Sequence, residues 1–322
     1  MAAAPHIIAL LAYEGFQLLD VTGPASVFSS ANQALQRRRY DVRVVSPRGG
    51  LVASSSGVAV ATCALARMPP GRVHTLLIAG AAEPPLRRVI ADRAVRRWVP
   101  RCAARAARFG SVCSGAFVLA ALGLLDGKRV ATHWEACDLL AGMYPAAAVD
   151  RDALYVTDGK LWTSAGVTTG IDMSLAMVEH DVGAPVANLV ARWLVLYARR
   201  PGYQSQFSPL LHAQVQADSP FAELIDWMQT RLCDRLDVPT LAARSGLSER
   251  SFYRKFLAAT GMSPAAFVDA IRLEAARTLL GRDLPLKTVS ARVGLTPRRL
   301  NQAFERRYGL SPQLFRGVHR NI

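Results

Sequence analysis

Cysteine is scarce in this sequence and poorly spaced for cross-linking. The five cysteines are odd in number and include no Cys-x-x-Cys pair; they are Cys63, Cys102, Cys113, Cys137 and Cys233. This pattern argues against a disulfide framework and against a zinc site. It favours a reducing compartment, and we expect the protein to be cytoplasmic.

Long apolar segments are absent as well. The longest apolar stretch, around residues 116–125, is too short to span a bilayer. The N-terminus is apolar over residues 1–13 but lacks a basic region and a convincing cleavage site, which favours a buried strand over a signal peptide. No phosphate-binding glycine loop and no metal-ligand cluster is found, so we expect no nucleotide or metal cofactor and no membrane partner.

Lysine is nearly missing, whereas arginine is abundant. The 322 residues include four lysines and thirty-five arginines, and the formal net charge is +15. A charge of this size favours acidic partners, nucleic acid first. A base-composition bias toward arginine and alanine could explain the same numbers, so charge alone does not settle the function. The arginine-rich segment 87–108 is expected to form a solvated helix face.

Short apolar runs alternate with helical patterns through the first 180 residues. The runs predict strands of a parallel sheet at 6–13, 40–45, 75–79 and 108–112. The helical patterns cover 21–35, 85–107, 114–125, 170–181 and 185–197. This alternation predicts an α/β sandwich. A polar segment with two prolines then marks the boundary, giving domains at 1–200 and 220–322 joined by a linker at 201–219.

The C-terminal domain contains an internal repeat. Residues 241–256 match residues 289–304 without a gap, at an offset of 48. The register continues through Gly261 and Gly309, through the two Ser-Pro pairs, and through Phe267 and Phe315. Such a repeat marks two copies of one supersecondary unit.

Each copy has the plan of a helix-turn-helix. A short helix ends at Gly246 or Gly294, which can take a left-handed conformation, and Ser248 or Thr296 then caps the next helix. The second helices are expected at 249–258 and 297–307, with one long helix at 264–280 holding them in successive major grooves. Their outward faces carry side chains suited to reading guanine or adenine: Arg250, Tyr253, Arg254, Arg298, Arg299, Asn301 and Gln302. The alternative is a helical bundle with a solvated basic face.

Residues 221–320 resemble the DNA-binding domain of the AraC/XylS family of bacterial regulators. The resemblance rests on the two glycine turns and on the segment 304–316, Phe-Glu-Arg-Arg-Tyr-Gly-Leu-Ser-Pro-Gln-Leu-Phe-Arg. It implies that double-stranded operator DNA is a partner and that the residues just named contact it. Leu295 stands where the family more often has Phe.

Cys113 lies in a pattern typical of a nucleophile elbow. The segment Ser-Val-Cys-Ser-Gly-Ala at 111–116 follows a predicted strand and opens a predicted helix, with small residues two positions to either side of the cysteine. A helix N-terminus would favour a thiolate there. His133 follows twenty residues later, and Asp20 ends the first strand-to-helix junction. The alternative is a buried structural cysteine.

These segments resemble the PfpI-like branch of the class I glutamine-amidotransferase-like superfamily, and their combination with the AraC-type region resembles GlxA-type regulators. The resemblance implies a flavodoxin-like, PfpI-like parallel-sheet sandwich followed by an all-α domain with two helix-turn-helix units. It implies a ligand pocket formed by Asp20, Gly80, Ala81, Cys113, Ser114 and His133. The family often has Pro-Gly-Gly where this chain has Ala79-Gly80-Ala81, which weakens the expectation of an oxyanion hole.

Two functions follow from these patterns. In the first, the N-terminal domain binds a small-molecule effector and alters DNA binding without being an enzyme; in the second, it is a cysteine-dependent hydratase or amidase. We expect sensing, and we expect a homodimer because two-fold regulators read paired half-sites. We also expect a protonated Asp20 that donates a hydrogen bond to the Cys113 thiolate.

Overall fold

The computed structural model describes residues 4–196, 199–200, 202, 206, 221–260, 262–282, 284–308 and 311–320. It divides into two compact units, Met1–Gln206 and Phe207–Ile322. Most of the predicted linker at 201–219 lies outside the described residues, as do Gly261 and Gly309 of the repeat.

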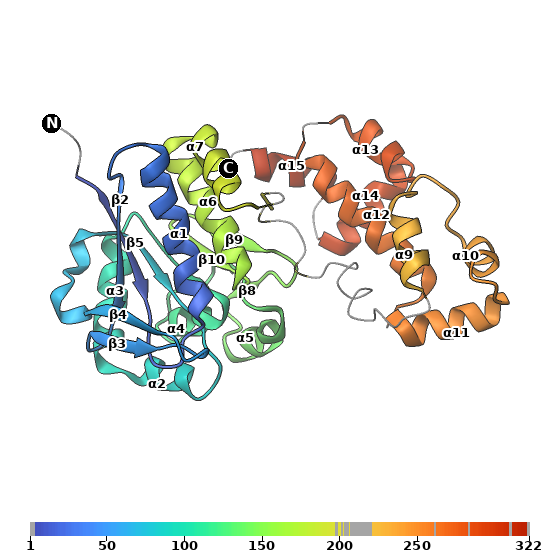
Figure 1. The fold of residues 1–322 in the computed structure, drawn as a ribbon. Coiled ribbons are helices and arrows are strands. Elements are labelled where there is room, and N and C mark those ends of the chain that lie inside the picture. The colour runs from blue at the N-terminus through green and yellow to red at the C-terminus, as the bar shows by residue number, and fades with distance from the viewer. Residues whose placement is uncertain are drawn as a thin grey trace. The chain divides into compact units, whose positions relative to one another are not determined.

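Unit 1 is built on an eight-stranded, mainly parallel sheet in the order β3-β4-β2-β1-β5-β6-β10-β9 (Figure 1). Its centre consists of β2 (Tyr40–Ser46), β1 (His6–Leu11), β5 (Val73–Ile78) and β6 (Arg108–Val112), which are the four predicted strands. Most residues of β1, β5 and β6 are buried because helices cover both sides of the sheet, whereas β2 carries Asp41 and an exposed Arg43. The predicted α/β fold class is therefore confirmed.

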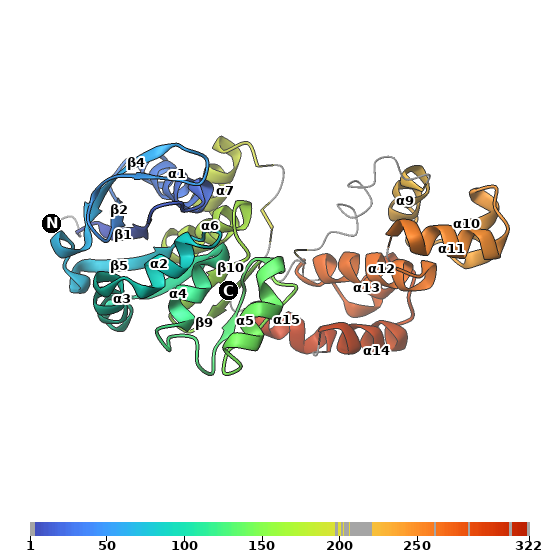
Figure 2. The same ribbon diagram turned by 90° about the horizontal axis from the view of Figure 1, so that it is seen from below.

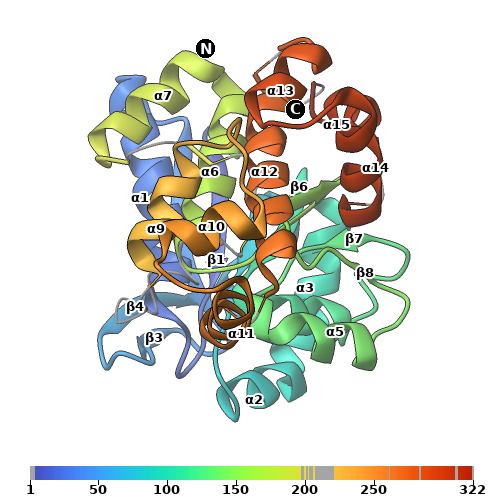
Figure 3. The same ribbon diagram turned by 90° about the vertical axis from the view of Figure 1, so that its right-hand side faces the viewer.

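The sheet edges were not predicted. On one side β4 (Ala59–Ala64) runs parallel to β2 and pairs antiparallel with β3 (Gly50–Ala53). On the other, β10 (Leu161–Ser164) runs parallel to β6 and pairs antiparallel with β9 (Tyr155–Asp158). A short ladder of β7 (Arg129–Val130) and β8 (Ala148–Val149) lies beside β9 and α5 (Cys137–Met143) (Figure 3).

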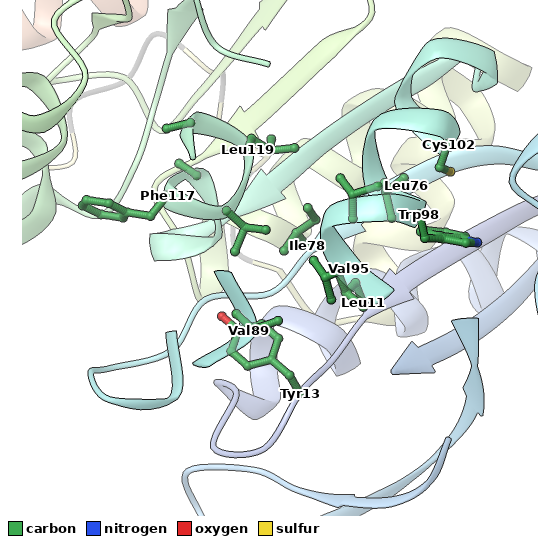
Figure 4. Close-up of a cluster of buried hydrophobic side chains, with 14 of the residues drawn as sticks. Leu11, Tyr13, Leu76, Ile78, Val89, Val95, Trp98, Cys102, Phe117 and Leu119 are labelled. Carbon is green, nitrogen blue, oxygen red and sulfur yellow. The ribbon is translucent and has the colours of Figure 1, made fainter. Parts of the chain in front are cut away.

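Helices form a layer on each face of the sheet. One layer contains α1 (Leu18–Ala34), α6 (Thr168–Val182) and α7 (Ala184–Trp193), which contact one another and share a buried apolar cluster with the sheet. The other contains α2 (Pro85–Ala91), α3 (Arg93–Arg105) and α4 (Ala116–Ala120). Figure 4 shows part of this second core, where Trp98 and Val95 of α3 face Leu76 of β5.

Three of the predicted helices are divided or shorter than expected, and the one expected at 185–197 ends at Trp193. The segment 85–107 is divided at Asp92, whose Oδ1 accepts hydrogen bonds from the N–H groups of Ala94 and Val95 at 2.8 and 3.2 Å and so caps α3. In the segment 114–125 only α4 is α-helical, because a 3-10 turn at Cys113–Gly115 precedes it and Gly123 takes a φ of +70° after it.

Unit 2 is helical throughout its described residues. It contains α9 (Ala222–Gln229), α10 (Val238–Arg244), α11 (Glu249–Thr260), α12 (Pro264–Leu280), α13 (Leu286–Arg292), α14 (Pro297–Tyr308) and α15 (Pro312–Arg320). Within this unit α12 lies between the α10–α11 pair and the α13–α14 pair (Figure 2). The long helix begins and ends where the sequence predicts, and both predicted second helices are present.

Candidate functional site

The turn at Cys113 is strained and closely surrounded. Cys113 has a φ of +57°, which is rare for a residue other than glycine. A Cβ on Gly115 would lie 2.3 Å from the Ile78 carbonyl oxygen, and one on Gly80 would lie 2.7 Å from the Ser114 nitrogen. The strained turn and its need for small neighbours are therefore as the sequence predicts.

A third glycine meets the cysteine from a segment far away in the sequence. Gly166 has a φ of +117°, and a Cβ on it would lie 2.6 Å from the Cys113 Cβ and 2.9 Å from the Sγ. The thiol therefore lies against bare backbone of the turn between β10 and α6. No local pattern around Cys113 signals this approach; the only hint is the glycine itself, two residues after Ser164.

Asp20 joins two backbone segments beside the elbow. Its side chain is buried in the first turn of α1. Oδ2 accepts a hydrogen bond from the Gly80 N–H at 2.8 Å, and Oδ1 accepts one from the Val167 N–H at 2.9 Å. Val167 itself has a φ of +50°, an unusual value for a β-branched residue. Burial raises the pKa of Asp20 to about 6, although the two N–H donors oppose this shift.

The Cys113 thiol does not have the lowered pKa that was expected. Burial and, after it, the negative charge of Asp20 raise its pKa to about 12, and hydrogen bonds from the Ser114 backbone and side chain only partly offset these effects. The helix that follows, α4, has five residues and offers little dipole. Both Asp20 oxygens accept backbone N–H groups, and the hydrogen bonds found among the described residues include none from Asp20 to Cys113. The expected donation to a thiolate is therefore not seen.

The N–H groups that could bind an oxyanion already have partners. Gly80 donates to Asp20, and Ala81 donates to the Ser114 Oγ at 2.9 Å. Ser114 in turn donates to the Ala81 carbonyl at 2.7 Å. Ala81 does not take a positive φ, so the alanine causes no backbone strain there. A substrate would have to displace these internal bonds.

His133 lies on a segment that contacts the elbow through its neighbour. Thr132 donates its hydroxyl to the Cys113 carbonyl at 3.0 Å. His133 itself is partly exposed, with Nδ1 3.7 Å from the Glu135 Oε2. The structure thus gathers Asp20, Gly80, Ala81 and Ser114 around the elbow, and it places His133 beside a residue that contacts Cys113.

The last described residues of unit 1 contact the segment that carries Thr132 and His133. The Gln206 Nε2 donates to the carbonyls of Thr132 and Ala153 at 3.0 and 2.9 Å. Six residues earlier, the Arg200 guanidinium forms a 2.6 Å ion pair with Asp172, a buried residue of α6. The Gly202 carbonyl accepts hydrogen bonds from the N–H groups of residues 154 and 155. Sequence reasoning missed the anchoring by Gly202 and Gln206 because it assigned both residues to a linker.

In unit 2 the second helix of each copy has an apolar and a polar face. Phe252 and Phe256 of α11 are fully buried, as are Leu300 and Phe304 of α14. The side chains expected at DNA are exposed at Arg250, Tyr253, Arg254, Arg298, Arg299 and Gln302. Asn301 is only partly exposed, and its Oδ1 is buried without a hydrogen-bond partner.

Two features of the turns agree with the helix-turn-helix plan. Gly246 and Gly294 have φ values of +64° and +67°. Ser248 Oγ accepts from the Ser251 N–H at 3.4 Å, and Thr296 Oγ1 accepts from the Arg299 N–H at 3.2 Å. The Arg299 guanidinium lies 3.3 Å from Asp269 of α12, so this arginine already has an acidic partner.

The described part of the chain contains neither a membrane-spanning helix nor a metal-ligand cluster. None of its helices is long and apolar enough to cross a membrane. Over the same residues, no group of three or more histidine, cysteine, aspartate or glutamate side chains is placed to hold a metal ion.

Comparisons with known proteins agree with both units. A model of the DJ-1/PfpI family matches residues 6–180, and a helix-turn-helix domain model matches residues 241–317. The HTH-type transcriptional regulator GlxA of Rhizobium meliloti (strain 1021) is 30% identical over 274 residues, which cover 85% of this chain and 83% of that protein.

Two further proteins resemble the chain. The isonitrile hydratase of Pseudomonas putida is 32% identical over 244 residues, covering 76% of this chain and 95% of the hydratase. The crystal structure of a THiJ/PfpI family protein from Pseudomonas syringae has a TM-score of 0.55 at 26% identity, covering 69% of this chain and 87% of that one. The chain thus belongs to the DJ-1/PfpI family and, with its AraC-type helix-turn-helix region, is a DNA-binding transcriptional regulator.

Proposed function

We propose that unit 1 senses a small-molecule effector at the cysteine elbow and that this binding changes how unit 2 binds operator DNA. The observation that carries the proposal is the pair of hydrogen bonds at Thr132. Its hydroxyl donates to the Cys113 carbonyl, while its own carbonyl accepts from Gln206, the last residue of unit 1. One residue therefore connects the elbow to the start of the DNA-binding unit along the chain.

A second connection runs through α6. The N–H of Val167, the residue before α6, donates a hydrogen bond to Asp20. Within α6, Asp172 accepts one from the Arg200 Nε. A ligand that displaced the Val167 turn or the elbow would disturb the anchors of residues 200 and 206 together. If this segment has two conformations that differ in DNA affinity, an effector that binds one of them more tightly shifts the population toward it. The free energy available for changing DNA affinity is then the difference between the effector's binding free energies for the two conformations.

The experiment begins with mass spectrometry of small molecules that the purified chain retains. Each compound recovered is then added to wild type and to Gln206→Ala while operator affinity is measured. We expect Gln206→Ala to bind the compound as wild type does but to show a smaller change in DNA affinity. Arg151→Ala, which removes an exposed ion pair with Asp138, is the control. Full coupling in Gln206→Ala would contradict this route.

For unit 2 we propose that Arg250, Tyr253, Arg254, Arg298, Arg299, Asn301 and Gln302 contact DNA. Six of these side chains are exposed on the outward faces of two helices that repeat one plan, and Asn301 of α14 is partly exposed. Arg250→Glu and Arg298→Glu should each weaken binding to a selected duplex by tenfold or more, because each replaces an attractive charge with a repulsive one. The control Arg97→Glu makes the same change on exposed α3 of unit 1. Unchanged affinity in both variants of unit 2 would contradict the assignment.

A second function is a cysteine-dependent hydration in unit 1. The similarity to isonitrile hydratase and the strained elbow favour it. The raised pKa of Cys113 and the occupied N–H groups of Gly80 and Ala81 oppose it. Incubation with an isonitrile decides the matter: formamide product from wild type and none from Cys113→Ala would establish turnover, and no product from either would leave sensing as the function.

We also propose a cytoplasmic homodimer, with a linker at 201–219 between domains 1–200 and 220–322. A two-fold regulator would read one operator site with each protomer. Sedimentation equilibrium of the full chain measures its mass directly, and a mass of 34.8 kDa at micromolar concentration would contradict the dimer.

A further inference from the structure

The two repeat copies differ at their equivalent glycine turns. Gly246 and Gly294 have nearly the same φ, +64° and +67°. A Cβ on Gly246 would meet nothing within 4 Å, whereas one on Gly294 would lie 2.2 Å from the Leu232 carbonyl oxygen and 3.0 Å from the Cys233 Cα. The second turn is therefore pressed against a loop that precedes the first copy, and the first turn has no such neighbour.

That loop, residues 232–234, also contacts the helix between the copies. The Arg272 Nε of α12 donates to the Leu232 carbonyl at 3.0 Å, and its Nη2 donates to the Asp234 carbonyl at 2.9 Å. Arg272 is partly buried. Its removal would leave the carbonyls of Leu232 and Asp234 without these donors, which costs free energy. Arg272 thus fixes the loop to α12 at two points.

The same loop contacts the end of the first helix of the second copy. The Cys233 Sγ lies 3.2 Å from the Ala291 carbonyl and 3.1 Å from the Arg292 carbonyl, the last two residues of α13. The Ala291 carbonyl also accepts a hydrogen bond from the Gly294 N–H at 3.2 Å, so the single S–H proton of Cys233 is free to donate to the Arg292 carbonyl at the end of the helix. In addition, Asp269, one turn before Arg272, holds Arg299 of α14.

We propose that residues 232–234 lock the two helix-turn-helix copies at a fixed separation, with Arg272 as the positioning residue. Here each half-site is the stretch of duplex read by one of the helices α11 and α14. Two helices held rigidly gain affinity from binding both half-sites only when the half-site spacing matches the spacing of the helices. The lock therefore makes DNA affinity depend sharply on half-site spacing, although Arg272 itself contacts no base. The proposal rests on DNA binding by α11 and α14.

The test uses the full-length chain and a library of random-sequence duplexes. Wild type is used to select and sequence duplexes, which gives the two half-site motifs and their preferred spacing. Affinity is then measured for three duplexes: the preferred spacing, the same motifs moved apart by five base pairs, and a single half-site. Arg272→Ala, the milder Arg272→Lys and Gly294→Ala are compared with Gly246→Ala and with Arg282→Ala, an exposed arginine just after α12.

We expect the Arg272 variants and Gly294→Ala to lose about tenfold in affinity for the preferred duplex, with little change for the single half-site. Their preference over the five-base-pair insertion should shrink. Gly246→Ala carries the same φ strain without the clash and should keep the spacing preference, as should Arg282→Ala. Retained half-site binding shows that the variants are folded.

Two results would overturn the inference while leaving DNA recognition intact. One is a spacing preference in Arg272→Ala and Gly294→Ala equal to that of wild type. The other is an equal loss on the single half-site and on the paired duplex in Arg272→Lys, which would make Arg272 a residue of general stability only. If wild type selected no duplex at all, DNA recognition would fail together with this inference.

Discussion

At the scale of single residues, the elbow depends on positions where no side chain fits. Gly80 and Gly166 approach Cys113 or Ser114 from two other segments, and Gly115 of the elbow itself approaches the Ile78 carbonyl. Gly115 belongs to a local pattern and could be predicted from the sequence. The approach of Gly166 and the bond from Val167 to Asp20 could not, because they join residues about fifty and 147 positions apart that only the folded sheet brings together.

The charge of Asp20 provides a prediction on the thiol. At pH values above about 6 Asp20 is ionised, and its charge adds to the effect of burial on the pKa of Cys113. Asp20→Asn should therefore lower the pKa of Cys113, although burial keeps it above the ordinary value. The pH dependence of iodoacetamide labelling, followed by mass spectrometry of the Cys113 peptide, measures this. Cys63, elsewhere in the sheet, is the internal control, and an identical Cys113 midpoint in both proteins would contradict the prediction.

Gly166 provides a second prediction at this scale. Gly166→Ala introduces a Cβ that would overlap the Cys113 side chain and an alanine at a φ of +117°. We expect a loss of about 3–4 kcal/mol in the free energy of unfolding, from overpacking and backbone strain together. Gly159→Ala, at a φ of +61° with nothing within 4 Å, should cost about 1–2 kcal/mol from the strain alone. Urea unfolding compares the two, and equal losses would rule out the contact.

At the scale of elements, a buried ion pair connects the sheet to a covering helix. Arg108 begins β6, and its guanidinium donates to both carboxylate oxygens of Asp181 near the end of α6, at 2.8 and 2.6 Å. Tyr40 of β2 donates to the same carboxylate at 3.1 Å, and Thr75 of β5 accepts from the Arg108 Nε at 2.9 Å. One helix is thereby tied to three strands at the end of the sheet opposite the Cys113 elbow.

Removal of one partner should be costly and dependent on pH. Burial alone would raise the pKa of Asp181, but the hydrogen bonds and charge of Arg108 lower it below the ordinary value. The stabilisation is therefore complete above the unfolded pKa near 4 and is lost as the pH falls through the lower folded pKa. Asp181→Asn should destabilise the fold by about 3–5 kcal/mol at pH 7, and by less at low pH.

Unfolding of wild type and Asp181→Asn from pH 7 to pH 3 measures this difference. Asp138→Asn removes an exposed ion pair with Arg151 and should cost less than about 1 kcal/mol at every pH. A constant difference between wild type and Asp181→Asn across the range would mean that the carboxylate charge is not the cause.

A helix or strand could be predicted where its own residues show a clear apolar pattern, without reference to the neighbour it pairs with. The strands β1, β5 and β6 and the helix α12 could be placed because both faces, or one continuous stripe, are buried, and β2 could be placed because apolar residues alternate with polar ones along it. The edge strands β3 and β9 have only four residues each; β3 is half exposed and β9 mixes polar with apolar residues, so their assignment depends on pairing with a neighbour. The break at Asp92 was missed because the apolar pattern continues across it, while a local cap decides where α3 begins.

At the scale of the whole molecule, the positive charge does not point to the DNA-binding surface by itself. Unit 1 has 22 basic and 14 acidic residues, and unit 2 has 17 and 10, so the net charges are +8 and +7. A composition bias toward arginine accounts for an even distribution of this kind. What distinguishes unit 2 is the arrangement of its arginines on the exposed faces of α11 and α14.

The salt dependence of DNA binding separates arrangement from total charge. Each phosphate contact releases counterions, so the slope of log K against log salt should fall in magnitude by about 0.9 when one contact is removed. Arg254→Gln on α11 should produce this change, whereas Arg97→Gln on α3 removes the same charge from unit 1 and should leave the slope as it is. Fluorescence anisotropy with a duplex of unrelated sequence, over a series of salt concentrations, isolates this electrostatic part. Equal changes in both variants would mean that DNA responds to the overall charge of the chain, and the basic faces of the two helices would then have no special part in binding.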